Sequence, residues 1–283
     1  MPIALYDLHN LLLGVLICGI WGLTGVAGYL AFHRVCPAIF SESERSLALA
    51  LLGVVATVNS LLLAFAAVSV WDSYKAAEQA VRGEAATIGV LGRDLAVFNT
   101  AESVSARDLL RTYGKSLLEK EWPAMQRAQA SDATWTAFDL MFRAFGRLDP
   151  AAPREAALMP EIWARADELV KYRRERLYAS EVCVPLTLWV VIAIGTLLTI
   201  TTTYVFPRTA FNTTAVGLLS ASLGLVFFFI VAMDRPFAGT ESIGPAPIVS
   251  ALSKMDRWNE DAAKLDSQVP AARVPLERKK ETP

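Results

Sequence analysis

Residues 46–98 read SLALALLGVVATVNSLLLAFAAVSVWDSYKAAEQAVRGEAATIGVLGRDLAVF, and this stretch decides the fold. Its first half, Ser46 to Val70, contains no Asp, Glu, Lys or Arg. About 20 apolar residues are enough for a helix to cross a bilayer. After Trp71 the composition turns to Ala, Glu and Lys, while apolar residues keep helical spacing. The stretch predicts one long helix, from about Ser46 to about Phe98, that leaves the membrane and enters the cytoplasm.

Three other long apolar runs also lack charged residues, at about 11–32, 182–206 and 212–233. The chain is 54% hydrophobic and 19% charged, whereas soluble proteins are about 45–50% apolar and about 25% charged. Residues 1–10 carry no Lys or Arg, so the first run is read as a retained helix and not as a signal peptide. We expect an all-α membrane protein with four transmembrane helices, the second and third of which extend into a cytoplasmic helical bundle.

The basic residues predict the orientation. All but three of the 27 Lys and Arg lie on the side that holds both termini and segment 72–181. The positive-inside rule therefore places that side in the cytoplasm. Asp7 and Arg34, at the two ends of the first run, favour the reverse orientation, but the basic cluster of 171–176 outweighs them.

The hydrophilic parts show further helical patterns. We expect helices over 105–121, with Ser105 as N-cap, over 132–148, and from Pro160 directly into the third span. A short amphipathic helix is expected in the tail, where apolar residues include Ile248 and Leu252. The predicted organisation is spans one and two in 1–71, the cytoplasmic segment 72–181, spans three and four in 182–233, the cytoplasmic tail 234–266 and a disordered end 267–283.

The sequence also argues against several classes of function. Its net charge of −1 gives no basic field for nucleic acid. The three Cys and two His have no metal-ligand spacing, so neither a metal nor a cofactor is expected. The chain lacks a catalytic triad and a phosphate-binding loop, so we expect no enzyme. A proton-coupled transporter is disfavoured because no carboxylate, His or Lys lies within a span.

The fourth span ends in the motif M-D-R-P-F-A-G, residues 233–239. Pro236 is expected to stop the helix, and Gly239 suits a left-handed turn. Asp234 and Arg235 then stand at the membrane boundary, where they are interpreted as a clamp between the fourth helix and the helical segment. The alternative is that Arg235 attracts anions or pairs with Asp72 or Glu181.

Three features together resemble the bacterial bestrophin-like domain family. The first is W-D-S-Y at 71–74, and the second is the following helix with Ala77, Val81, Glu84, Ala85 and Arg93. The third is M-D-R-P-F-A-G, followed by Ile243, Pro245 and Pro247. The motif and interface positions are Trp71, Tyr74, Glu84, Asp234, Arg235, Pro236, Phe237 and Gly239.

The resemblance implies a homo-oligomer in a bacterial inner membrane, pentameric in true bestrophins, whose second helices line an anion pore. Lipid, ions and further copies of the chain are the expected partners. The pore-lining candidates are Asn59, Leu62, Phe65, Ala66 and Ser69. Polar groups in a span more often bond to neighbouring helices, which is the simpler interpretation of Asn59. The acidic calcium cluster of bestrophins has no counterpart that maps onto this chain. The alternative function is a non-conducting scaffold or sensor that acts through its cytoplasmic helices.

Overall fold

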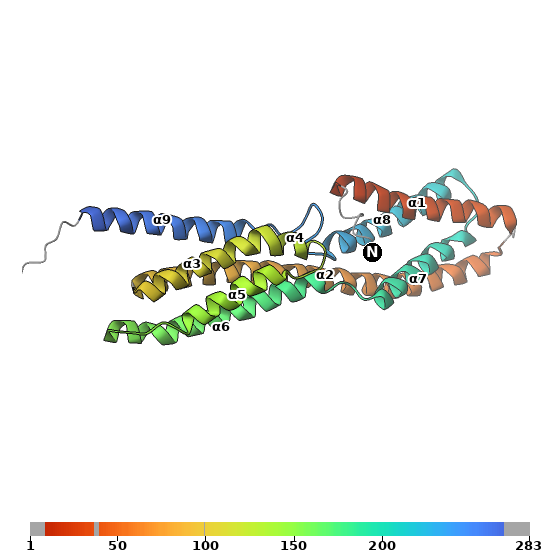
Figure 1. The fold of residues 1–283 in the computed structure, drawn as a ribbon. Coiled ribbons are helices and arrows are strands. Elements are labelled where there is room, and N and C mark those ends of the chain that lie inside the picture. Colours follow the sequence, from red (N-terminus) through yellow and green to blue (C-terminus); the bar gives the residue numbers. More distant parts are fainter. Residues whose placement is uncertain (1–8, 37–39, 99, 269–283) are drawn as a thin grey trace, which may run out of the picture. The chain divides into compact units, whose positions relative to one another are not determined.

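A computed structural model describes residues 9–36, 40–98 and 100–268, with side chains up to Trp258, and it confirms the all-α class (Figure 1). The contacts divide the chain into two compact units. Unit 1 contains 1–81, 119–132 and 171–244, and unit 2 contains 82–118, 133–170 and 245–283. The helices are α1 (Asn10–Val35), α2 (Glu42–Phe98), α3 (Ala101–Ser116), a π-helical turn (Leu117–Glu121), α4 (Trp122–Met125), α5 (Asp132–Phe145), α6 (Pro153–Glu181), α7 (Leu186–Thr202), a 3-10 turn (Thr203–Val205), α8 (Ala210–Met233) and α9 (Ala246–Gln268).

Four helical segments are long and apolar enough to cross a membrane: α1, α2, α7 with its 3-10 turn, and α8. Only 11% of the most apolar window is buried inside the chain in α1 and in α2, and 33% in α8. Exposed apolar side chains such as Leu186 and Phe211 would be costly in water. The four segments are therefore membrane spans, as the sequence predicts.

In unit 1, α1 and α8 lie side by side, and small residues let them approach closely (Figure 1). A Cβ added at Gly224 would lie 2.9 Å from the backbone Cα of Cys18. Gly22 faces Ala221 in the same way. The small-residue face that the sequence shows on the fourth span is thus the surface that packs on α1.

The second span packs inside unit 1 through one of its faces. Leu63, Ala66 and Val70 of α2 are buried with Ile192 of α7 and Phe227 of α8. Dispersion and close packing hold this contact, because lipid removes the hydrophobic driving force between helices. The opposite face of α2 carries exposed residues over the same length.

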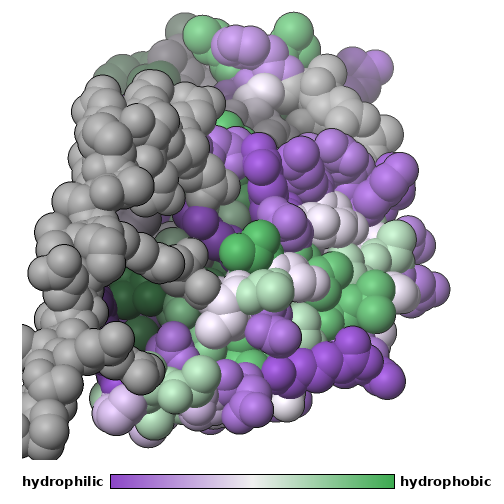
Figure 2. Space-filling view, turned by 60° about the vertical axis from the view of Figure 1, so that its left-hand side comes forward, coloured by the Kyte–Doolittle hydropathy of each residue, from purple (hydrophilic) through white to green (hydrophobic). Residues whose placement is uncertain are grey.

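Unit 2 has its own apolar core. Ile88, Leu91 and Leu95 line the buried face of α2. Phe138, Met141 and Phe145 form most of the buried face of α5. Figure 2 shows one end of this unit, where hydrophilic residues cover much of the surface and apolar residues are scattered between them. Such a surface is typical of a segment in water.

Some predicted boundaries are wrong. The cap of α3 is Thr100, which forms a capping box with Ser103, so Ser105 lies inside the helix. The sequence places a helix start at Pro160, but α6 begins at Pro153 and contains Pro160. α9 runs to Gln268, and the remainder of the segment predicted to be disordered, 269–283, lies outside the described residues.

The expected direct run into the third span is also wrong. α6 ends at Glu181, and α7 begins at Leu186 with Pro185 as its N-cap. A proline disfavours helical conformation in the residue before it and has no N–H to donate. The chain therefore leaves the helix over 182–185 before it enters the membrane, and only the second span continues without a break.

Candidate functional site

The segment Asp234–Ile243, called here the α8 turn, connects the ends of several helices of unit 1. Gly239 has a φ of 91°, which is the left-handed conformation that the sequence predicts at this position. The backbone N–H of Ile243 donates to the carbonyl oxygen of Pro236 at 2.8 Å and closes the turn. Because Pro236 and Gly239 fix its backbone, the turn can present neighbouring side chains in defined directions.

Asp234 connects the end of α8 to the start of α7. Its side chain is buried, and Oδ1 accepts a hydrogen bond from the backbone N–H of Val184 at 2.6 Å. Val184 belongs to the break before α7, where the backbone has left helical geometry. The motif carboxylate therefore satisfies a donor that the break would otherwise leave without a helical partner.

Phe237 packs the same turn against the short helix α4. Its ring is 2% exposed and meets Trp122 of α4 edge-on, with ring centroids 5.7 Å apart. Edge-to-face aromatic pairs stabilise by about 0.5–1.5 kcal/mol beyond the area they bury. Phe237 is therefore an apolar anchor of the turn.

The start of α1 and the middle of α2 reach the turn through polar contacts. Tyr74 donates from its hydroxyl to the carbonyl oxygen of Glu241 at 2.9 Å, and Asn10 donates to the Glu241 carboxylate at 2.6 Å. Thr240 donates to the side-chain oxygen of Asn10. Burial, with Glu78 and Glu241 nearby, raises the pKa of Tyr74, so its hydroxyl keeps its proton for this bond. The sequence motif around Trp71 and the motif after α8 therefore meet in space.

Trp71 precedes this contact by one helical turn. Its ring stacks with that of Tyr74 at a centroid distance of 6.4 Å, and the ammonium group of Lys75 lies 4.9 Å from its centroid. An aromatic ring with a Lys beside it is typical of the membrane–water interface. Arg235 is half-buried, and its pairing with Asp72 or Glu181 stays a prediction.

A buried ion cluster lies in the same unit. Glu121 is fully buried, and its two carboxylate oxygens accept from Arg173 at 2.7 Å and from Arg176 at 2.8 Å. Both arginines are also buried, and Arg176 contacts the sulfur of Met125. Glu121 ends the π-helical turn Leu117–Glu121, and single π-turns are common at functional sites.

The sequence interpretation missed this cluster. It used KYRRER, residues 171–176, only as a basic cluster that sets the orientation. Lys171 and Arg174 are exposed as that role requires, but Arg173 and Arg176 point inside. Their i, i+3 spacing, which places two arginines on one helix face, was the available signal. A single sequence does not show which distant carboxylate they meet.

Glu84 belongs to unit 2 and not to the α8 turn. It is fully buried in α2, and its carboxylate accepts a hydrogen bond from the hydroxyl of Tyr113 in α3. The Tyr113 ring packs on Phe138 of α5 at a centroid distance of 5.3 Å. Glu84 therefore ties three helices of unit 2 together.

The five pore-lining candidates do not share one exposed face of the single chain. Asn59 and Ala66 are buried, and Asn59 donates to the hydroxyl of Thr196 in α7 at 3.3 Å. Leu62 is partly buried, while Phe65 and Ser69 are exposed. Asn59 thus makes the helix–helix hydrogen bond that is usual for a polar group in a span. A pore-lining role stays a prediction for all five residues.

A metal site is absent from the part of the chain that the structure describes, where no three His, Cys, Asp or Glu side chains are grouped to hold an ion. The polar groups of the α8 turn are instead engaged with one another and with backbone. These contacts are those of a junction that holds helices together.

Comparisons with known proteins agree with this architecture. The family profile described as "Bestrophin-like domain" matches residues 20–248. A solved structure, described as the crystal structure of a membrane protein, is similar with a TM-score of 0.56 and 14% identity, and the match covers 89% of this chain and 96% of the other. That likeness concerns the fold alone. The search of curated proteins found no match. The matched segment contains part of the first span, all of the other three, the motif around Trp71 and the α8 turn. Because it covers most of the chain, the chain belongs to the bestrophin-like family.

Proposed function

We propose that the chain assembles into a homo-oligomer in which the α2 helices line a path for small ions across the bacterial inner membrane. Both termini and segment 72–181 then lie in the cytoplasm, as the basic residues predict. The protein acts passively and not as an enzyme. The family resemblance implies an anion as the ion that passes.

The observation that supports this proposal is the exposed face of α2. Gly53, Thr57, Ser60 and Ala64 follow one another at three- to four-residue spacing, and all four are exposed in the single chain. Residues at this spacing share one face of a helix. The face is made of small and hydroxyl-bearing residues.

The two hydroxyls of this face are suited to an environment without bulk water. Thr57 donates to the carbonyl oxygen of Gly53 at 2.7 Å, and Ser60 donates to that of Thr57 at 2.9 Å. Each hydroxyl proton is thus satisfied inside the helix. Small residues with hydroxyls allow close helix contacts in lipid and can wet a narrow path.

Assembly is required for any such path. Within the single chain α2 is packed through Leu63, Ala66 and Val70, so its small-residue face has no described neighbour in the same chain. Several copies that turn this face inward would enclose a path, with Phe65 near the edge of the face as a candidate hydrophobic constriction. Asn59 and Ala66 then lie on the opposite face of α2, where they pack against the other helices of the same chain.

Ion flux into liposomes tests the proposal. Purified protein should release K⁺ or Cl⁻ faster than empty vesicles, with both ions measured because the resemblance alone implies the anion. Ser60→Leu should lower the flux at least tenfold, whereas Val190→Leu, on an exposed position of α7, should leave it unchanged. An oligomer without flux of either ion would instead support the scaffold or sensor. Equal flux in Ser60→Leu and the wild type would remove the assigned face.

A further inference from the structure

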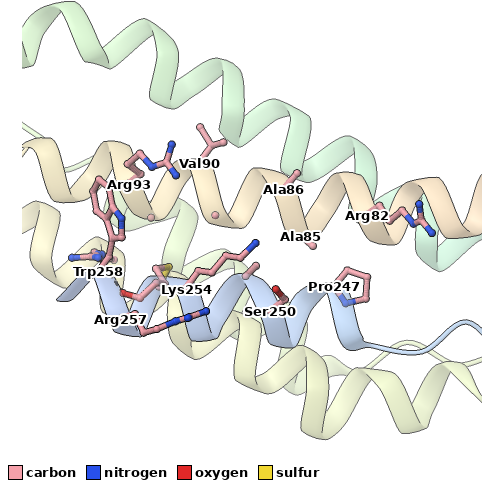
Figure 3. Close-up of a pocket in the computed structure, with 15 residues that line it drawn as sticks. Arg82, Ala85, Ala86, Val90, Arg93, Pro247, Ser250, Lys254, Arg257 and Trp258 are labelled. Atoms are coloured by element: carbon pink, nitrogen blue, oxygen red, sulfur yellow. Dashed lines mark hydrogen bonds between the residues drawn. The ribbon is translucent and has the colours of Figure 1, made fainter. Parts of the chain in front are cut away.

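Unit 2 contains a cavity of about 690 Å³ that involves α2, α3 and α9 (Figure 3). Small residues leave this space open along α2, where Ala85, Ala86 and Gly89 contribute to the wall. A Cβ added at Gly89 would meet no other atom within 4 Å. The volume falls in the range of about 300–1,000 Å³ that is usual for sites of small ligands.

The lining of this cavity has a single sign of charge. Five basic side chains contribute to it: Arg82 and Arg93 from α2, Arg107 from α3, and Lys254 and Arg257 from α9. No Asp or Glu lies among its described lining residues. In Figure 3 the Lys254 side chain extends from α9 toward α2, Arg93 lies beside Trp258, and Arg82 lies at the far end. A concave surface of one sign concentrates ions of the opposite sign.

The carboxylates that act on Arg107 lie outside the lining of the cavity. Asp256 pairs with Arg111 at 2.8 Å, and neither residue lines the cavity. Burial lowers the pKa of Arg107, although Asp108 and Asp256 oppose the shift, and a guanidinium stays charged at neutral pH. Its Nη2 donates to the carbonyl oxygen of Met255 at 3.4 Å, while its buried Nε has no hydrogen-bond partner among the described residues. Arg107 therefore keeps a positive charge and an unused donor.

The other end of the cavity combines charge with an aromatic ring. The guanidinium of Arg93 lies 5.2 Å from the ring centroid of Trp258. This contact orients the guanidinium without neutralising it. Arginine side chains bind phosphate and carboxylate oxygens through two parallel N–H donors, which lysine complements as a point charge.

We propose that this cavity binds a small soluble polyanion through its phosphate or carboxylate oxygens. A soluble ligand is favoured over a lipid headgroup because Arg82 follows Trp71 by eleven residues of continuous helix. At 1.5 Å per residue, this places Arg82 about 16 Å along the helix beyond the interfacial tryptophan, and Arg93 about 33 Å. Binding requires neither conduction nor the assignment of the pore face, so the two proposals stand or fall separately.

Calorimetry on the full-length protein in detergent tests the site. Pyrophosphate and citrate serve as phosphate and carboxylate probes, with NaCl of equal ionic strength as the reference. At least one probe should bind saturably, and added salt should weaken the binding. Arg107→Gln and Lys254→Gln should each raise the Kd at least tenfold. Lys115→Gln, on an exposed position of α3 outside the cavity, should change it less than twofold.

Three outcomes would overturn the proposal. The first is the absence of saturable heat with both probes. The second is an unchanged Kd in Lys254→Gln, whose exposed side chain can be replaced without disturbing the core of unit 2. The third is Lys254-dependent binding to phosphatidylglycerol vesicles when neither soluble probe binds, which would assign the site to a lipid headgroup.

Discussion

Asp234 accepts the backbone N–H of Val184 at 2.6 Å, and this bond joins the end of α8 to the break that precedes α7. The N-terminus of a helix has donors without helical partners and carries a partial positive charge. A carboxylate at this position therefore stabilises α7 both as an acceptor and as an anion. The break over 182–185 and the Asp234 carboxylate therefore act together to join the third and fourth spans.

Removal of this carboxylate should destabilise unit 1. Asp234→Ala leaves the part-buried N–H of Val184 without this acceptor, and an unsatisfied buried donor costs about 1–3 kcal/mol at most. Asp234→Asn keeps a carbonyl acceptor and should lose less. Thermal unfolding in detergent checks this order, with Asp139→Asn as the control because Asp139 forms an exposed i, i+4 pair with Arg143. Equal stability of Asp234→Ala and the wild type would contradict the role given to the bond.

Replacement of Glu121 should be the most damaging single change in this set. Glu121→Gln leaves two buried guanidinium groups without their counter-charge, and breaking a buried ion pair in this way costs about 3–5 kcal/mol. The unfolding temperature of the purified variant measures the lost stability. If too little variant is obtained to purify, its expression yield relative to the wild type is compared instead.

The matched control lies on the same π-helical turn. Glu119→Gln removes an exposed carboxylate two residues away and should change stability little. The combination Glu121→Leu with Arg173→Met and Arg176→Met should recover stability lost in Glu121→Gln, because replacing all the charges leaves none buried and unpaired. If Glu121→Gln and Glu119→Gln unfold alike, the cluster does not stabilise unit 1.

The contact between α1 and α8 should depend on Gly224. Gly224→Val places side-chain atoms against the backbone of Cys18, and over-packing of this kind costs about 1–3 kcal/mol. Gly19→Ala on α1 is the control, since its added Cβ would meet no neighbour within 4 Å and alanine favours helix. Cross-linking of cysteines engineered at facing positions of α1 and α8 should fall in the first variant only. Unaltered cross-linking in Gly224→Val would refute the close approach.

A pH dependence is expected from Asp94 in unit 2. Burial raises the pKa of its carboxyl, Glu161 raises it further, and Arg165 and Arg93 partly oppose the shift. Because the folded pKa lies above the unfolded one, ionisation opposes folding from the unfolded pKa upward, and the penalty is complete above the folded pKa. Asp94→Asn should therefore unfold at a higher temperature than the wild type at pH 7. That difference should shrink as the pH falls through the folded pKa and be lost below the unfolded value of about 3.9. A difference that does not change between pH 7 and acid would contradict this account.

Much of the fold could be predicted from the sequence because the features concerned are local. A charge-free run of more than twenty residues has few structures open to it, so the four spans and the long α2 follow from composition and period. Pro236 and Gly239 likewise act through their own backbone preferences. The prediction of one continuous helix from Pro160 into the third span was wrong. It gave too little weight to one proline, Pro185, which is the N-cap of α7.

The site was less predictable because its contacts are distant in sequence. Arg173 and Arg176 look like surface charges until the fold brings Glu121, about fifty residues earlier, between them. The interior partner of Asn59 could not be read from its position either, because the hydroxyl of Thr196 and the space at Gly195 belong to another helix. Spacing along one helix identifies a face, and only the partner helix decides what that face meets.

The mass of the detergent-solubilised protein, measured by light scattering with the detergent contribution subtracted, tests the central claim most directly. The single chain is 30.8 kDa. Several copies are needed to bring the Gly53–Ala64 faces of α2 around one path. We predict a single species whose mass is a whole multiple of the chain, at least three and pentameric if the bestrophin resemblance extends to assembly. A stable monomer would contradict the account, because a single chain cannot enclose the proposed pore.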